Sequence, residues 1–180
     1  MRTIAIAGVA LWALAVGVGV REIYAYSTEP GSQATAPRTW PEESQLRAPA
    51  GRPAIVMFVH PECPCTRASL AELTAIAARA GDRASITIVA EGTGAGWDAA
   101  ARVPGAVRVL DPLGTEAARF GARTSGHVVV YDRFGVHRYA GGITGSRGHV
   151  GDNVGRRLVE SIIDGAPTSE LAHVVFGCAL

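Results

Sequence analysis

The sequence lacks the features that mark nucleic-acid-binding proteins and disulfide scaffolds. Its 180 residues carry 17 basic and 16 acidic side chains, without a basic stripe or a run of interleaved aromatic residues. Electrostatic binding to nucleic acid therefore has no support, and we exclude nucleic acid as a partner. The 3 cysteines are an odd number, which excludes a fully paired framework and leaves a reactive thiol, a ligand set or an intermolecular bond.

The usual phosphate-binding motifs are also missing. No Lys-Ser/Thr pair follows the glycine-rich residues 141–153, so a Walker-type phosphate cradle is excluded. Residues 91–98 contain Gly-x-Gly but lack the third glycine and the helix start of a dinucleotide site, and we expect a flexible insertion there. Asp152 or Asn153 is expected to cap the last helix. An alternative role for the glycine-rich loop before this cap is to lie near the cysteines and to contact a partner.

The first part of the chain is an uncharged apolar run, residues 3–20. At about 1.5 Å per residue it gives about 27 Å of helix, close to the thickness of a bilayer's hydrocarbon core. We expect residues 1–22 to be a transmembrane anchor with its N-terminus inside, and a cleaved secretory signal is the alternative. Either way the domain is exported. We expect a bacterial inner-membrane protein whose domain faces the periplasm, where disulfides persist, or a secreted protein after cleavage.

The rest of the chain divides by composition into a linker, a domain and a tail. Residues 23–52 are rich in Pro, Ser, Thr and Gly and are expected to be a flexible linker. The domain is expected over residues 53–166 and a C-terminal tail over residues 167–180. Strand patterns cover residues 54–59, 84–90, 106–110, 127–132 and 137–141, and helical patterns cover residues 69–80, 115–120 and 153–164. This order predicts an α/β fold, a mixed sheet with helices on both faces.

Two cysteines stand one proline apart where the first strand ends and its helix begins. A thiol at a helix N-terminus faces unsatisfied N–H groups and the positive end of the macrodipole, which lower its pKa below the ordinary value of about 8.5. Cys63 is therefore the expected attacking thiolate. Pro64 suits the first helical turn, where its missing N–H is not needed. His60 is a candidate to add positive charge or to take a proton.

The other two cysteines are candidate partners for Cys63. A bond between Cys63 and Cys65 closes a very small ring, so it should be strained and easily reduced, as in an oxidant or an isomerase. Cys178 lies near the end of the chain, and a tail that folds back would bring it to Cys63 as a resolving thiol. The alternative for Cys178 is a thiol without a role.

These features together resemble a thioredoxin fold, and more narrowly the membrane-anchored periplasmic thiol–disulfide oxidoreductases of the TlpA type. The family pattern F-W-A-x-W-C-P-P-C-R-x-E-L aligns with residues 58–70 without a gap and places Cys63 on the nucleophilic cysteine. A second match covers residues 109–142. In this register the family's second cysteine falls on Thr66 and its cis-proline on Gly126. The RedB-like sequences are most similar, since they share the C-P-C, the "TSG" and the "FGC".

The resemblance implies disulfide exchange with protein thiols and disulfides of the periplasm, without an organic cofactor. Cys63 would form a mixed disulfide that Cys65 resolves, while Ser125 and Gly126 line the cleft and present backbone groups to the partner.

The alternative is a protein that binds or delivers copper(I) or zinc. Its ligands would come from His60, Cys63, Cys65 and Cys178, with His127 as a further candidate. Gly126 favours this alternative, because a glycine there removes an obstructing ring and leaves a free N–H. Against it, no C-x-x-C pair or H-x-x-x-H run completes a four-ligand site.

Overall fold

In the described part of the chain, residues 2–48, 50–166 and 171–180 of a computed structural model, one mixed sheet has the strand order β3-β2-β1-β4-β5-β6. Strands β1, β2 and β3 are parallel, β4 is antiparallel to both β1 and β5, and β6 is parallel to β5. The strands are β1 (Ala54–Val59), β2 (Ser85–Ala90), β3 (Ala106–Leu110), β4 (His127–Tyr131), β5 (His137–Gly142) and β6 (Leu171–Ala172). The predicted mixed sheet is confirmed.

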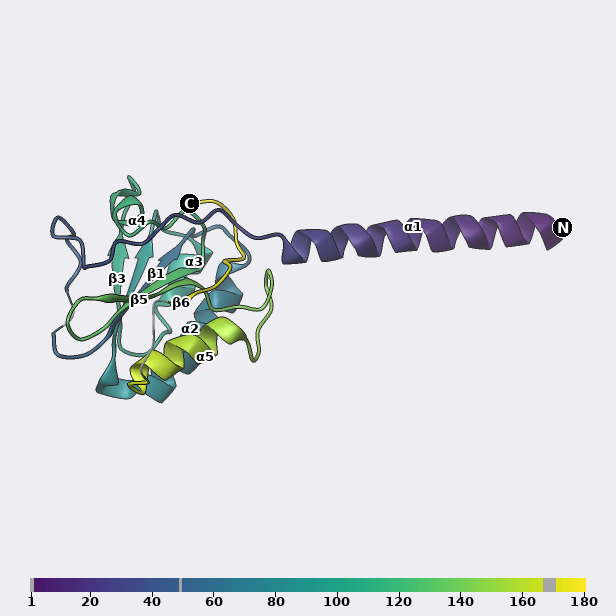
Figure 1. The fold of residues 1–180 in the computed structure, drawn as a ribbon. Coiled ribbons are helices and arrows are strands. Elements are labelled where there is room, and N and C mark those ends of the chain that lie inside the picture. The colour runs from purple at the N-terminus through teal and green to yellow at the C-terminus, as the bar shows by residue number, and fades with distance from the viewer. Residues whose placement is uncertain (1, 49, 167–170) are drawn as a thin grey trace.

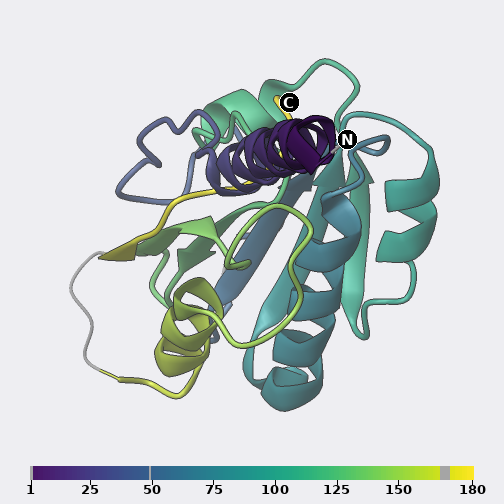
Figure 2. The ribbon, with the colours of Figure 1, turned by 90° about the vertical axis from the view of Figure 1, so that its right-hand side faces the viewer.

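Helices cover both faces of this sheet, as predicted (Figures 1 and 2). The covering helices are α2 (Thr66–Ala80), α3 (Ala95–Ala100), α4 (Thr115–Arg119) and α5 (Val154–Ile163), and the chain also has an N-terminal helix α1 (Arg2–Thr28). Helices α2, α3 and α5 share one apolar core with the sheet, and α4 shares a second core with its other face. Every residue of β1 is buried, because successive side chains of this strand enter the two cores in turn.

Helix α1 projects away from the domain, and none of its residues is buried (Figure 1). By length and composition it could cross a membrane. The helix continues to Thr28, six residues past the predicted boundary at residue 22. Pro30 follows shortly after, and the residue before a proline is disfavoured in helical conformation, which explains where α1 ends.

Part of the segment that the sequence predicted to be a flexible linker, residues 23–52, lies against the domain. Ala36 and Leu46 are buried in the core beside α4. The ring of Trp40 packs edge-on against Phe120 and Tyr131, with centroids 5.0 and 5.2 Å apart. Because α4 spans only five residues, this segment covers the sheet face that α4 leaves open.

Two further elements were not predicted. The expected flexible insertion at residues 91–98 is wrong, because α3 begins within it at Ala95. Gly96 allows this helix to approach the turn that carries Cys63: its N–H donates to the Pro61 carbonyl (2.8 Å), and an added Cβ would lie 2.9 Å from the same oxygen. Strand β6 belongs to the expected tail, of which residues 167–170 lie outside the described residues.

Asn153 caps α5 and closes the glycine-rich loop before it. Its side-chain oxygen accepts from the N–H of Arg156 (2.9 Å), and its Nδ2 donates to the carbonyl of Ile143 (2.9 Å). We expect Asn153→Ala to lower the free energy of unfolding by about 1–2 kcal/mol in denaturant titrations. Asp152→Ala is the control: this neighbour is exposed and pairs with Arg157, and its loss should cost less than about 0.5 kcal/mol. Equal losses would contradict the assignment of the cap.

Candidate thiol site

Cys63 and Cys65 lie in the turn between β1 and α2. The N–H of Cys63 donates to the His60 carbonyl (3.2 Å), and the N–H of Thr66 donates to the Cys63 carbonyl (3.1 Å). Cys65 is the N-cap of α2, and both thiols are nearly buried, with exposed fractions of 5% for Cys63 and 8% for Cys65. Pro64 lies in this turn, not in the first helical turn as predicted, because α2 begins two residues after it.

Thr66, at the position of the family's second cysteine, ties this turn to the loop before β4. Its hydroxyl donates to the His60 carbonyl (3.0 Å) and lies 2.8 Å from the hydroxyl of Ser125. The Ser125 hydroxyl in turn accepts from the His60 N–H (2.9 Å). The alignment placed Thr66 at the position of the family's second cysteine but assigned it no role. The only sign in the sequence was a hydroxyl residue where a thiol was expected.

Gly126 differs from the expectation of an open position. Its φ is +90°, and its N–H is not free, because it donates to the Phe58 carbonyl (2.8 Å). A Cβ at this position would lie 2.7 Å from the Ser69 hydroxyl, so Ser69 fills the space that the metal alternative required. No peptide bond among the described residues is cis.

The end of the chain folds back onto the thiols. Its backbone pairs with the loop before β4: the Ser125 N–H donates to the Cys178 carbonyl (2.8 Å), and the Leu180 N–H donates to the Arg123 carbonyl (3.1 Å). The backbone N–H of Ser125 is therefore taken by the tail, whereas the sequence predicted that a partner would use it. This pairing brings Cys178 Sγ to 2.7 Å from Cys63 Sγ, and both thiols are free.

Arg147, from the glycine-rich loop, joins the thiols, the tail and the end of α1. Its guanidinium donates to the Gly177 carbonyl (2.6 Å) and lies over the ring of Tyr26 at 4.9 Å. Its positive charge acts to lower the pKa of Cys65, against the larger effect of burial. The sequence pointed to the loop and its arginine without a role for this side chain, because only the folded tail and α1 give Arg147 its partners.

The surroundings of the three thiols make Cys63 the most acidic. Burial raises the pKa of Cys63, but hydrogen bonds from the Cys178 thiol and from backbone N–H groups outweigh burial and lower it. Burial raises the pKa of Cys65, and the neighbouring Cys63 raises it further. Burial and the hydrogen bond to Cys63 raise the pKa of Cys178 to about 11. Of the three thiols, Cys63 therefore loses its proton most readily.

The predicted histidines contribute less than expected. His60 lends its backbone to the turn, while its ring Nδ1 accepts from the Glu62 N–H (3.2 Å). His127 is buried, and within the described part of the chain neither of its ring nitrogens has a hydrogen-bond partner. Burial and the nearby His137 lower the pKa of His127 to about 4. No group of three or more His, Cys, Asp or Glu side chains among the described residues is placed to hold a metal ion.

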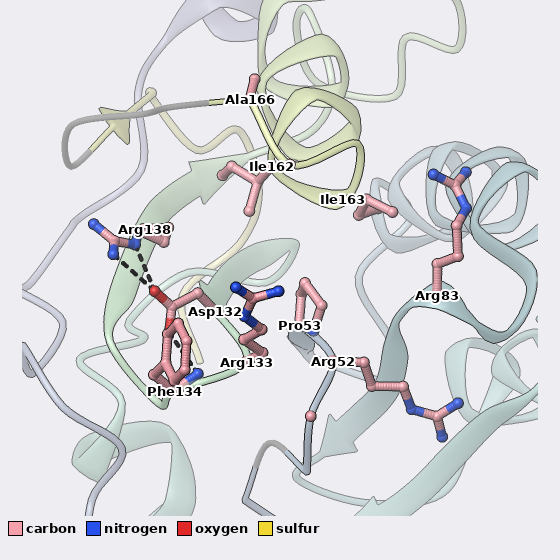
Figure 3. A pocket seen from close by; sticks show the side chains of 12 residues that line it. Arg52, Pro53, Arg83, Asp132, Arg133, Phe134, Arg138, Ile162, Ile163 and Ala166 are labelled. Carbon is pink, nitrogen blue, oxygen red and sulfur yellow. Dashed lines mark hydrogen bonds and ion pairs between the residues drawn. The ribbon is translucent and has the colours of Figure 1, made fainter.

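Two hollows flank these elements. A small one of about 190 Å³, between the start of α2 and α3, is lined in part by Cys63, Pro64 and Thr66. A cavity of about 810 Å³ lies where β1 begins, at the opposite end of the strand from the thiols (Figure 3). Arg83 and Arg138 line this cavity, but each pairs with an aspartate, Asp164 and Asp132 respectively. Of these two hollows, only the first is lined by a cysteine.

No protein-family model and no curated protein matches the chain. Among solved structures, an uncharacterized conserved protein from Geobacillus kaustophilus is 19% identical with a TM-score of 0.61, over 84% of this chain and 90% of that one. A hypothetical protein from Sinorhizobium meliloti is 18% identical with a TM-score of 0.60, over 85% and 96%. A secreted disulfide oxidoreductase from Mycobacterium tuberculosis is 18% identical with a TM-score of 0.47, over 64% and 83%.

Likeness at these identities concerns the fold and not the activity. The strand order, with parallel β1 to β3 followed by the antiparallel pair β4 and β5, agrees with the fold predicted from the sequence. The chain therefore has a thioredoxin-like fold, with Cys63 and Cys65 between the first strand of the sheet and α2.

Proposed function

We propose that this protein exchanges disulfides with protein partners and that Cys63 is the attacking thiolate. The observation that carries the proposal is the contact of 2.7 Å between Cys63 Sγ and Cys178 Sγ, made by two free thiols of unequal acidity. A thiolate is the nucleophile in disulfide exchange, and a second thiol within reach completes the reaction.

The exchange proceeds in two steps. The Cys63 thiolate attacks a partner disulfide, a mixed disulfide forms, and the first partner sulfur leaves and takes up a proton. Cys178 then gives up its proton and attacks Cys63 Sγ, which releases the second partner sulfur as a thiol. The partner gains two electrons, and the Cys63–Cys178 disulfide holds the oxidised state. An oxidising partner runs the same steps in reverse.

Cys178 suits the resolving step better than Cys65, to which the sequence assigned it. The pKa of Cys178 is raised by burial and by its hydrogen bond to Cys63. Once Cys63 is in a mixed disulfide it carries no charge, so this second cause is lost while the positive charge of Arg147 remains. The resolving thiol is thus held protonated until its target has formed.

The proposed location is the bacterial inner membrane, with α1 as the anchor and the domain in the periplasm, as in the TlpA-type and RedB-like proteins. Arg147 supports a site close to the membrane, because it contacts both Gly177, the residue before Cys178, and the end of α1: its guanidinium donates to the Gly177 carbonyl, and its own N–H donates to the Ser27 carbonyl (2.9 Å). Partners would then present their thiols or disulfides near the membrane surface.

A redox titration of the full chain in detergent tests the proposal. The protein is assayed for bound copper and zinc, poised in glutathione buffers and alkylated to count free thiols. We expect two thiols to disappear together in one two-electron step, at a potential well above the roughly −300 mV of structural disulfides. Peptide mapping should identify Cys63 and Cys178. Stoichiometric metal that blocks alkylation would overturn the proposal in favour of metal delivery.

A further inference from the structure

The end of the chain occupies the backbone edge next to Cys63. Two backbone hydrogen bonds hold the tail there: the Ser125 N–H donates to the Cys178 carbonyl, and the Leu180 N–H donates to the Arg123 carbonyl. Between them, Thr124 and Ala179 form an antiparallel bridge. An extended peptide of another protein that adds to this edge would need the same N–H and carbonyl groups. The tail and a partner segment therefore compete for one place.

Three consecutive residues of the tail, 176–178, each meet surroundings that restrict which side chain fits there. Phe176 is nearly buried. Gly177 lies so close to the loop that a Cβ would stand 2.0 Å from the Ser125 carbonyl oxygen, and its own carbonyl accepts from Arg147. Cys178 then meets Cys63. An apolar residue, a glycine and a cysteine satisfy all three positions.

We propose that residues 176–178 are a built-in copy of the partner's reactive segment, so that the site takes an apolar–Gly–Cys peptide in the conformation of the tail after the tail has left. This inference rests on the proposed function. The partner's cysteine, in a disulfide, is attacked by Cys63 while its backbone pairs with residues 123–125. The returning tail then displaces the peptide from the edge, and the Cys178 thiolate displaces its sulfur, which takes up the proton that Cys178 gave up.

Gly177→Ala tests the competition, because the added methyl group prevents the tail from pairing and leaves Cys63 and the strand–helix turn that carries it unsubstituted. It is compared in a Cys178→Ser background, where adducts on Cys63 are not resolved by the tail. The control is Gly145→Ala, whose Cβ meets only ordinary contacts, the nearest at 3.6 Å. The probes are the glutathione mixed disulfides of the peptides Val-Val-Phe-Gly-Cys-Ala-Leu and Val-Val-Phe-Ala-Cys-Ala-Leu, and mass spectrometry follows the adduct on Cys63 of the full chain.

We expect Gly177→Ala to accelerate adduct formation with the Gly-Cys peptide by about tenfold or more, since the lost backbone hydrogen bonds no longer hold the tail in place. Gly145→Ala should react like the background. The Gly-Cys peptide should react about tenfold faster than the Ala-Cys peptide in every variant, because the Ser125 carbonyl excludes a methyl group. Faster amide exchange over residues 174–180, with β1 and β4 still protected, shows that the tail has left a folded domain.

Two other results separate the inference from the proposed function. Equal rates for the two peptides, or no acceleration in Gly177→Ala, would overturn the inference. Should Gly177→Ala not fold, the rates of the two peptides on the Cys178→Ser chain still show whether the site requires a glycine before the peptide's cysteine. Glutathione disulfide needs no backbone pairing, so its failure to modify Cys63 in any variant would overturn the proposed function itself.

Discussion

Cys63→Ser abolishes disulfide exchange, and Cys178→Ser stops it at a mixed disulfide between Cys63 and the partner. Both expectations follow from the sulfur contact of 2.7 Å and from the lowered pKa of Cys63, which burial raises but hydrogen bonds lower more strongly. A serine hydroxyl at residue 63 cannot act as the nucleophile at neutral pH, so the rate falls to that of the reaction without protein. A serine at residue 178 leaves the first step intact but removes the second thiol.

Cys65→Ser is the matched control, since it removes a thiol of the same cluster by the same substitution. We expect it to keep most of the turnover, because Cys178 remains against Cys63. Non-reducing electrophoresis and mass spectrometry after exposure to a protein disulfide distinguish the variants: a trapped adduct in Cys178→Ser and none in Cys65→Ser. The opposite pattern would assign the resolving role to Cys65, as the sequence suggested.

The sheet could be predicted because each strand and each long helix is marked by the pattern of its own residues. The strands are short apolar runs between turn residues, and α2 and α5 show helical periodicity, so pattern and element agree to within a few residues. The packing of Ala36 and Leu46 on the sheet face beside α4 could not be predicted, because they are single apolar residues in a polar, proline-rich stretch. Their burial depends on a sheet face formed by residues far away in sequence. Helix α3 likewise depends on the approach of Gly96 to Pro61.

The candidate site likewise has residues that local sequence predicts and residues whose roles depend on distant parts of the chain. The place of Cys63 at a helix start is a local property of one strand–helix junction, and the sequence contained it. The approach of Cys178 was a hypothesis there, since the apolar residues before it indicated only that a tail could pack. Thr66 and Arg147 escaped assignment because each acquires its role from groups distant in the chain, Ser125 for the threonine and Gly177 for the arginine.

The buried His127 should make the protein lose stability as the pH falls from about 6.5 to 4. Burial and the neighbouring His137 lower its folded-state pKa to about 4, whereas an unfolded histidine titrates near 6.5. Between these values the unfolded chain binds a proton that the folded chain refuses, so the stability is complete above about pH 6.5 and declines below it. At about 1.4 kcal/mol per pKa unit, the full loss is about 3 kcal/mol.

His127→Leu should remove most of this pH dependence, because an apolar side chain of similar size binds no proton. Urea titrations at pH 7, 5.5 and 4 measure the free energy of unfolding of both proteins. His149→Leu is the control, as it removes an exposed histidine from the glycine-rich loop. Asp164, whose pKa is lowered by hydrogen bonds from Arg83 and Arg79, loses its contribution to stability only below about pH 5, where its unfolded carboxyl titrates, so the change between pH 7 and 5.5 reports His127 apart from it. A pH dependence that survives in His127→Leu would mean that another group refuses the proton, and the unpartnered ring of His127 would then have no part in acid unfolding.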